Sequence, residues 1–264
     1  FAIQDTGEWS LLDELGMDAP LIPFGEHALA FRDGTESLIT ALTGKLTKGR
    51  LMRMAVSTIG WMDGRFTICM ENGMMFDAGA LIVAIPARYA ERLFYTFVPE
   101  ISKRLRNYHY DTILRVTLGY HKHDIPHPIV GEHIHQDVIY PFVLAMSHPA
   151  RVPDNEHDLI QVGARFSPKS NPEHVIQETI DHFEWGQNPL IKRVSFWAEA
   201  DPLSSKDDEH HDNMTAIRQA LPDGISLIGS DYGEVHHAHI GVARLDDRIR
   251  QGREAAQQAI QFLK

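Results

Sequence analysis

The stretch from Gly224 to Lys264 constrains the fold more than any other part of the sequence. A short apolar segment ends at Gly229, a polar loop follows, and the pattern then predicts a helix that opens at Asp247. A strand, a glycine loop and a helix start are typical of nucleotide-binding α/β folds, in which backbone N–H groups face an anion or the polar edge of a ring. The chain nevertheless contains no Gly-x-Gly, which such folds normally use near their beginning to grip a pyrophosphate. The sequence therefore indicates the closing part of a cofactor-binding domain without its opening part.

Composition narrows the class of protein. The 264 residues suffice for one large domain or two modest ones, and the hydrophobic content of 43% is that of an ordinary globular protein. The formal net charge of −11 argues against nucleic acid as a partner, because no basic surplus is present to displace phosphate counterions. The apolar runs are too short to cross a bilayer, and no secretory signal is visible.

The single cysteine, Cys69, excludes an internal disulfide and a cysteine-rich zinc site, and it suits a reducing cytoplasm, where we expect the protein. Its place in an alternating run predicts a strand thiol that is at least half-buried rather than a nucleophile. Because the chain begins at Phe1 instead of methionine, we expect it to be processed, truncated or a piece of a longer protein.

The order of elements predicts an α/β fold with α+β character. Helices are expected at 9–16, with Ser10 as its cap, and at 35–46, 172–185 and 214–221, the third preceded by Asn171. The segment 18–26 is expected to be a connector and 207–212 a charged surface segment. Strands are expected at 51–59, 65–71, 74–85, 110–120, 137–146, 159–166 and 192–200. Asp63-Gly64 and Asn72-Gly73 predict tight hairpin turns, so the first three strands form a meander.

Several blocks together resemble the flavin-dependent amine oxidases, with the nearest pattern in the protoporphyrinogen oxidases. They are Asp33-Gly-Thr-Glu-Ser-Leu-Ile-Thr-Ala-Leu, Ala55-Val-Ser-Thr-Ile, Asp77-Ala-Gly-Ala-Leu-Ile-Val-Ala-Ile-Pro, Ser195-Phe-Trp-Ala-Glu-Ala-Asp-Pro-Leu and Asp247-Arg-Ile-Arg-Gln-Gly-Arg-Glu-Ala-Ala. As a pattern, these blocks are distributed along most of the chain, from Asp33 to Ala256. The chain departs from the family in lacking the first β-α-β unit and in a longer loop at 232–245 that bears His236, His237 and His239.

The resemblance implies FAD as the cofactor and assigns residues to it. Val56 would lie near the adenine end, and the N–H groups around Arg248 and Ile249 would face the flavin pyrimidine edge. The cofactor-binding residues it implies are Val56, Gly229, Ser230, Asp247, Arg248 and Ile249. Trp197 would line the cavity of a small-molecule substrate, and no catalytic acid or base is assigned. Independently of the family, a helix N-terminus carries partial positive charge that stabilises an electron-rich reduced flavin.

The resemblance also implies the domain plan. Residues 1–90 would form part of the FAD-binding domain, a helix plus a meander, of the glutathione-reductase-like type. Residues 91–215 would form a substrate-binding domain with a mixed sheet, and residues 216–264 would return to the FAD-binding domain as its C-terminal strand and helix.

The 16 histidines raise the alternative of a metal enzyme, with close pairs at 121 and 123, 133 and 135, 210 and 211, and 236, 237 and 239. Neither His-Glu-x-x-His nor Cys-x-x-Cys occurs, so these histidines are interpreted as solvated loop residues and no metal is expected. A serine hydrolase and a phosphate-loop enzyme are disfavoured because Gly-x-Ser-x-Gly and Gly-Lys-Ser/Thr are absent.

The leading hypothesis is thus an FAD-dependent oxidoreductase that oxidises a C–N or C–H bond by hydride transfer to the flavin. The alternative is a flavin-free binding or interaction module, or a half-protein that pairs with a separate dinucleotide-binding chain. The missing glycine motif favours this alternative for the chain taken alone. A homo-oligomer and a partner chain carrying the dinucleotide-binding unit both remain open.

Overall fold

The computed structural model describes residues 2–4, 7, 9–24, 28–49, 53–108, 110–125, 132–133, 139–146, 152, 154–202, 208–233 and 242–264. The chain divides into two compact units, each built from three stretches of sequence. The first unit comprises 1–47, 111–200 and 238–244, and the second comprises 48–110, 201–237 and 245–264. These borders differ from the expected domain borders near residues 90 and 215, and the roles expected of the domains stay predictions.

The first unit contains a four-stranded sheet in the order β14-β1-β3-β2. Its strands are β1 (Ala2–Gln4), β2 (Leu21–Phe24), β3 (Ala28–Phe31) and β14 (Val242–Ala243), and β1 pairs with β14 in parallel and with β3 in antiparallel fashion. The expectation of a connector at 18–26 was wrong, because β2 forms there. Pro23 is tolerated since β2 is an edge strand, where a missing N–H costs no ladder bond.

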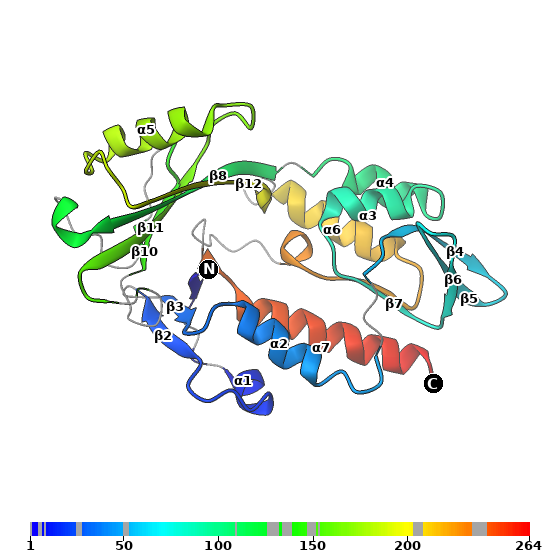
Figure 1. The fold of residues 1–264 in the computed structure, drawn as a ribbon. Helices are drawn as coiled ribbons and strands as arrows, with labels where there is room; N and C mark the ends of the chain where they lie inside the picture. The colour runs from blue at the N-terminus through cyan, green and yellow to red at the C-terminus, as the bar shows by residue number, and fades with distance from the viewer. Residues whose placement is uncertain are drawn as a thin grey trace. The chain divides into compact units, whose positions relative to one another are not determined.

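The larger sheet of the first unit has the order β12-β8-β11-β10-β9. The strands are β8 (Tyr110–His121), β9 (Glu132–His133), β10 (Phe142–Met146), β11 (His157–Ala164) and β12 (Ile191–Pro202), with the ends of β8 and β12 reaching into the second unit. Helix α5 (Pro172–His182) lies along one face, as Figure 1 shows, and buries Val175, Ile176 and Ile180 against the sheet. Asn171, expected to precede this helix, is its N-cap, and its side chain accepts a hydrogen bond from the Glu173 N–H at 3.0 Å.

Two further helices belong to the first unit, α1 (Ser10–Glu14) and α2 (Glu36–Gly44), together with the 3-10 turn η1 (Lys122–Asp124). Ser10 does not cap α1: the N-cap is Trp9, and no side-chain cap bond forms, so that expectation was wrong. On α2, Leu38 is buried, whereas the neighbouring Ile39 is 54% exposed.

The second unit contains the meander β4 (Val56–Met62), β5 (Arg65–Met70) and β6 (Met75–Ala78). Both residues of the Asp63-Gly64 turn have positive φ, as the hairpin prediction requires. Cys69 lies half-buried on β5, as expected. The single strand expected at 74–85 proved to be two, because the chain leaves the meander after Ala78 and forms β7 (Leu81–Val83) in another sheet.

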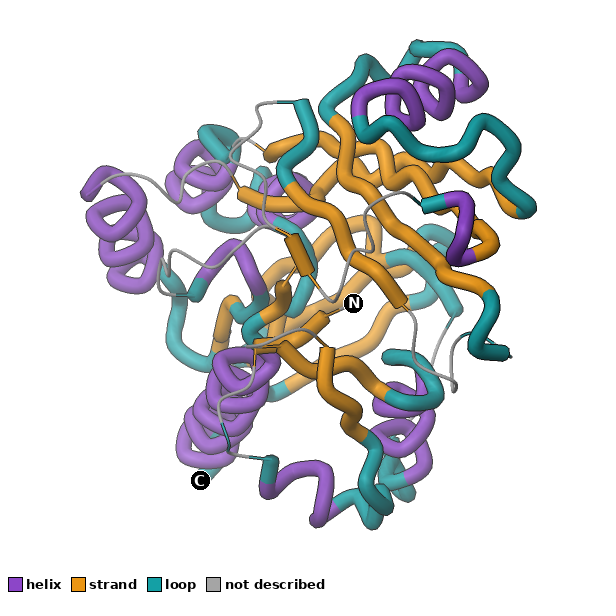
Figure 2. Tube along the Cα trace, turned by 90° about the vertical axis from the view of Figure 1, so that its left-hand side faces the viewer, coloured by secondary structure: helices purple, strands orange, loops and turns teal. Residues whose placement is uncertain are grey.

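Strand β7 pairs in parallel with β13 (Ile225–Leu227), which brings together two strands that lie far apart in the sequence. The helices of this unit are α3 (Ala87–Phe94), α4 (Pro99–Leu105), α6 (Asp208–Ala220) and α7 (Leu245–Phe262), with the 3-10 turn η3 (Ser230–Tyr232). In Figure 2, α7 is the long helix that leads to the C-terminus. The segment 207–212 was expected to be a charged surface segment, but its described residues, 208–212, form the beginning of α6. The core of the unit joins Phe66, Phe94 and Ile101 to Met214 and Ile217 of α6. Mixed helices and sheets in both units confirm the α/β class with α+β character.

Candidate functional site at the end of the parallel strand pair

The candidate site lies where the parallel strands β7 and β13 end. The Ile228 N–H donates to the Val83 carbonyl at 3.1 Å, which keeps the two strand ends together. Beyond this bond the chain turns at Gly229, whose φ of 132° favours glycine, and enters η3. In open parallel sheets ligands bind outside the carboxyl ends of the strands, so this edge is where the fold would place a ligand.

The turn from Gly229 to Gly233, called here the Gly229 turn, is tied to the beginning of α7 by side chains. The Gly229 N–H donates to Gln251 Oε1 at 2.8 Å, and Gln251 Nε2 donates to Asp247 Oδ2 at 2.6 Å. Asp247 is only 4% exposed, and its carboxylate also accepts from the guanidinium groups of Arg248 and Arg250. The turn and the helix therefore form one connected polar network.

Gly233 allows the closest approach in this network. A side chain added at Gly233 would bring its Cβ to 2.7 Å from Asp247 Oδ2 and 2.8 Å from Gln251 Nε2. A glycine here thus permits the turn to pack directly on the carboxylate.

The structure brings five of the six expected cofactor residues into this region. Gly229 and the exposed Ser230 belong to the turn, and Asp247, Arg248 and Ile249 lie on α7. The helix begins at Leu245 rather than at Asp247, so the N–H groups of its first turn precede Arg248 and Ile249. Val56 begins β4 and is 37% exposed. Trp197, expected to contact substrate, is a half-buried residue of β12 in the first unit.

A buried acid, Asp231, anchors the turn and was missed by sequence reasoning. Its Oδ2 accepts hydrogen bonds from the Ala87 N–H at 2.7 Å and from the Tyr110 hydroxyl, and the side chain is 3% exposed. Asp231 thereby caps α3, whose own N-cap, Pro86, makes no side-chain cap bond. The signal available in the sequence was the short Gly-Ser-Asp-Tyr-Gly cluster, which contains the acid but does not indicate its hydrogen-bond partners.

Three tyrosines surround this acid. The Tyr108 hydroxyl donates to the Asp231 carbonyl at 2.6 Å, and the Tyr232 hydroxyl donates to the Ile85 carbonyl at 2.8 Å. Burial, reinforced by the Asp231 charge, raises the pKa of Tyr108, Tyr110 and Tyr232 well above the ordinary value. The three hydroxyls therefore stay protonated and act as donors that fix the Gly229 turn.

His210 was expected in a solvated loop, and that interpretation was wrong. It lies on α6, is 8% exposed, and its Nδ1 is 3.4 Å from the Tyr108 hydroxyl. Burial lowers the pKa of His210 below its ordinary value, and the nearby Arg218 acts in the same direction.

We expect His210 to make the protein less stable in mild acid. In the unfolded state the His210 imidazole binds a proton near pH 6.5, whereas in the folded state burial disfavours its protonation. The free energy of unfolding is therefore undiminished by this histidine above pH 6.5 and decreases as the pH falls below that value. Urea unfolding between pH 7.5 and 5.5 should show a weaker loss for His210→Gln than for the wild type. The other histidines contribute equally to the pH dependence of both proteins, so only the difference between wild type and variant reports on His210. An identical dependence of the free energy of unfolding on pH would contradict the prediction.

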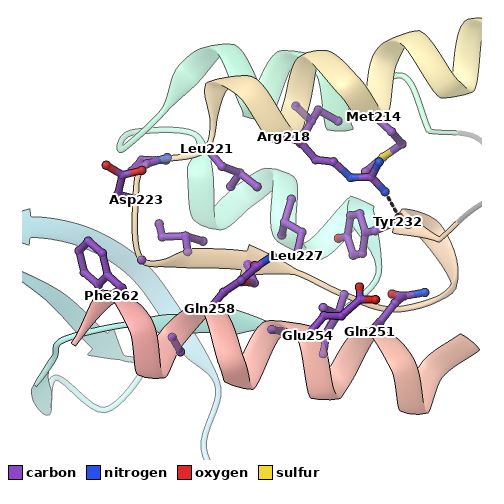
Figure 3. A pocket seen from close by; sticks show the side chains of 18 of the residues that line it. Met214, Arg218, Leu221, Asp223, Leu227, Tyr232, Gln251, Glu254, Gln258 and Phe262 are labelled. Atoms are coloured by element: carbon purple, nitrogen blue, oxygen red, sulfur yellow. Dashed lines mark hydrogen bonds between the residues drawn. The ribbon is translucent and has the colours of Figure 1, made fainter. Parts of the chain in front are cut away.

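A cavity of about 760 Å³ lies beside the site, within the second unit. Figure 3 shows β13 lying between α6 and α7 with side chains of both helices directed toward the space. The cavity reaches Ile228, Gly233 and Gln251 at the turn and continues to Phe262 near the end of α7. The cavity thus touches both ends of the Gly229 turn, whereas none of the six residues expected to bind the cofactor is among the residues that line it.

No metal centre is formed by the residues that the structure describes, since none of their His, Cys, Asp and Glu side chains gather in a group of three able to hold an ion. The His121 ring instead stacks with His123 and packs against His157. The side chain of His133 and the residues His135, His236, His237 and His239 lie outside the described part. Within that part, too, none of the helices has the length and apolar character required to span a bilayer.

Comparison with known proteins identifies the relatives of this arrangement. The family described as flavin containing amine oxidoreductase matches residues 8–181. Among solved structures, a protein assigned as a protoporphyrinogen oxidase from an Exiguobacterium species is 18% identical with a TM-score of 0.69, over 91% of this chain and 54% of its own. A putrescine oxidase variant is 14% identical with a TM-score of 0.66, over 88% and 54%. The cyclohexylamine oxidase of Brevibacterium oxydans is 13% identical with a TM-score of 0.61, over 91% and 55%.

At these identities the structures show the shared fold, and the chain spans about half the length of each of these three relatives. No curated protein matches the sequence. The family match extends over well more than half of the 264 residues. The chain belongs to the flavin-containing amine oxidoreductase family.

Proposed function

We propose that the chain forms the substrate-binding part and the later cofactor-binding parts of an FAD-dependent oxidoreductase, which oxidises a C–N or C–H bond of a small molecule. Family membership supports a flavin enzyme. Two of the structural relatives are named for amines, putrescine and cyclohexylamine, which supports a C–N bond as the first choice to test.

The observation that carries the proposal is the pair β7–β13 with its carboxyl edge at the Gly229 turn. This pair ends beside the start of α7, and the Gln251 side chain connects the two. The arrangement supplies the strand, glycine turn and helix start that a nucleotide-binding α/β fold uses for its ligand.

The residues present fit the flavin end of FAD better than its pyrophosphate. The cavity opens beside the turn, Ser230 is exposed, and the N–H groups of the first turn of α7 precede Arg248. Ser230 and that helix turn would hold the flavin pyrimidine edge, and Trp197 would line the substrate site. When bound, the flavin supplies the hydride acceptor, whereas this chain orients it and keeps the turn rigid through Asp231 and Gln251.

One observation favours a second candidate, a half-protein that needs a partner chain for its dinucleotide-binding unit, or a flavin-free binding module. The Gly229 N–H is already bonded to Gln251, and the buried Asp247 carboxylate in the first turn of α7 already accepts from the side chains of Arg248, Arg250 and Gln251. Protein side chains therefore already bind some of the polar groups of the turn, and the chain has no Gly-x-Gly motif to bind a pyrophosphate.

Titration with FAD tests the proposed function. The purified chain, alone and mixed with a dinucleotide-binding unit, is incubated with FAD, desalted and examined by absorbance. We expect retained yellow flavin, which putrescine or another amine bleaches in the absence of oxygen. If the preparation stays colourless both alone and with the dinucleotide-binding unit, the oxidoreductase hypothesis is contradicted and the flavin-free binding module is supported.

A further inference from the structure

The five-stranded sheet of the first unit has α5 along one of its faces (Figure 1). Alternate residues of β8 belong to the same core as α5, namely Leu114, Val116, Leu118 and Tyr120. Because successive side chains of a strand point to opposite faces, Arg115 and Thr117 lie on the other face. Their register partners on β11 are Gly163 and Gln161, which share that face.

The register of β12 against β8 follows from contacts at both ends of the pair. At one end, a Cβ added at Gly119 would lie 3.1 Å from the Cβ of Ile191. At the other end, Thr112 Oγ1 donates to the Ala198 carbonyl at 3.2 Å. Both contacts fit a single antiparallel register in which odd-numbered residues of the two strands share a face. Val194 agrees with it, because this even-numbered residue packs against the core on the α5 side.

The register brings a second arginine to the face that carries Arg115. Ser195 lies opposite Arg115, and Arg193 lies opposite Thr117. Arg193 is therefore a diagonal neighbour of Arg115, a relation in which Cα atoms are typically about 7–8 Å apart. Trp197, which is expected to line the substrate site, follows on the same face of β12. The group Arg115, Thr117, Gln161, Arg193 and Ser195 is called here the Arg115 patch.

The donors of the Arg115 patch lack acceptors. Arg115 is half-buried on a strand with neighbours on both sides, and Arg193 is exposed on the edge strand. Neither guanidinium forms an ion pair with a carboxylate of the described residues. Ser195 Oγ is buried and has no hydrogen-bond partner in the described part of the chain. Buried polar groups normally have a partner, so this patch is suited to an acceptor from outside.

The chemistry of the patch selects a small anion. A guanidinium presents a planar fork of N–H donors that matches a carboxylate in two parallel hydrogen bonds, and the Ser195 hydroxyl offers a further donor. Two cations side by side also repel a ligand that is itself a cation. The chain as a whole has a formal net charge of −11, so the positive charge of this face is local.

We propose that the Arg115 patch binds a carboxylate group of the substrate, so that the substrate is an amino acid rather than a simple amine. This inference rests on the proposed function and deepens it by naming the substrate class. The carboxylate accepts hydrogen bonds from Arg115 and Arg193, and the hydrocarbon part extends along β12 toward Trp197. Putrescine, a cation at both ends, gains nothing from this patch.

A matched pair of ligands tests the carboxylate site without FAD. The probes are putrescine and γ-aminobutyrate, which has the same number of carbon atoms and a carboxylate in place of one amine. Calorimetry at low salt measures their binding to the chain. We expect γ-aminobutyrate to bind at least tenfold more tightly than putrescine. Arg115→Gln and Arg193→Gln should each weaken γ-aminobutyrate binding at least tenfold, because each removes a charged donor.

Arg65→Gln is the control, since Arg65 is exposed on β5 and its replacement removes the same charge outside the patch. This variant should bind γ-aminobutyrate as the wild type does. Arg115→Lys keeps the charge but loses the fork, so an intermediate affinity is expected. Thermal unfolding midpoints equal to that of the wild type confirm that the variants fold. In NMR spectra, the Nε–H signals of Arg115 and Arg193, identified by their absence in the two variants, should shift with γ-aminobutyrate and not with putrescine.

Three results overturn the proposal: equal affinity for both probes, equal effects of Arg115→Gln and Arg65→Gln, or tighter binding of inorganic phosphate than of γ-aminobutyrate at the patch. The proposed function fails separately. If γ-aminobutyrate binds at the patch but the chain stays colourless with FAD and a dinucleotide-binding unit, the carboxylate site stands and the oxidoreductase does not. If flavin is retained and putrescine bleaches it while the arginine signals stay unshifted with γ-aminobutyrate, the oxidoreductase stands and the carboxylate site does not.

Discussion

Replacement of Asp231 by alanine is expected to lower the free energy of unfolding by about 3 kcal/mol, because each buried donor that loses its partner costs about 1–3 kcal/mol. The substitution removes the acceptor of the Ala87 N–H and of the Tyr110 hydroxyl, both of which are then left without this partner in the second unit. It also removes the only side-chain cap seen for α3 among the described residues. Urea denaturation followed by circular dichroism measures the loss.

The matched control is Asp223→Ala, because Asp223 is exposed and its removal should change stability by less than about 0.5 kcal/mol. Asp231→Asn keeps one acceptor oxygen and should fall between the two. If Asp231→Ala were as stable as Asp223→Ala, the acid would not anchor the turn, and the rigidity argued for the candidate site would have no basis.

A methyl group at Gly163 should also be strongly destabilising, by about 2–3 kcal/mol, because overpacking a dense core displaces side chains and backbone. Gly163 on β11 lies directly opposite Phe142 on β10. An added Cβ would approach the ring of Phe142 to 2.3–2.7 Å, and that ring is 2% exposed, so it has no free space to occupy. The thermal unfolding midpoint of Gly163→Ala gives the measurement.

Gly60→Ala is the control for this prediction, since Gly60 also lies in a strand but has nothing within 4 Å of the added Cβ. Its stability should equal or slightly exceed that of the wild type, because alanine restricts the unfolded chain. Equal behaviour of the two variants would show that the sheet yields to the added methyl group.

Local signals predicted the elements whose causes are local. The Asp63-Gly64 turn and the Asn171 cap follow from the conformational and hydrogen-bonding properties of those residues, and the structure confirms both. The predictions were wrong where contacts between residues far apart in the sequence determine the structure. The break after Ala78 exists because β7 pairs with β13 rather than with the meander, and no local residue pattern announces that partner.

Some features of the candidate site were likewise predicted from local sequence patterns, whereas others depend on contacts between distant residues. The sequence identified the turn at Gly229 and the helix that follows, because a glycine between an apolar strand and an amphipathic helix is a local pattern. It did not identify Asp231 as the anchor, since the partners Ala87 and Tyr110 are 144 and 121 residues away. Nor did it predict that Gln251 would occupy the Gly229 N–H, which depends on the docking of α7.

The pairing of β1 with β14 has a consequence for biosynthesis. Ala2 and Val242 are register partners, so this sheet cannot close until the segments around both residues have left the ribosome. Until then one edge of β1 stays open, and exposed strand edges in nascent chains recruit other chains. Expression at low temperature or with chaperones that shield early segments should therefore raise the yield of native protein more than it does for proteins whose sheets close locally.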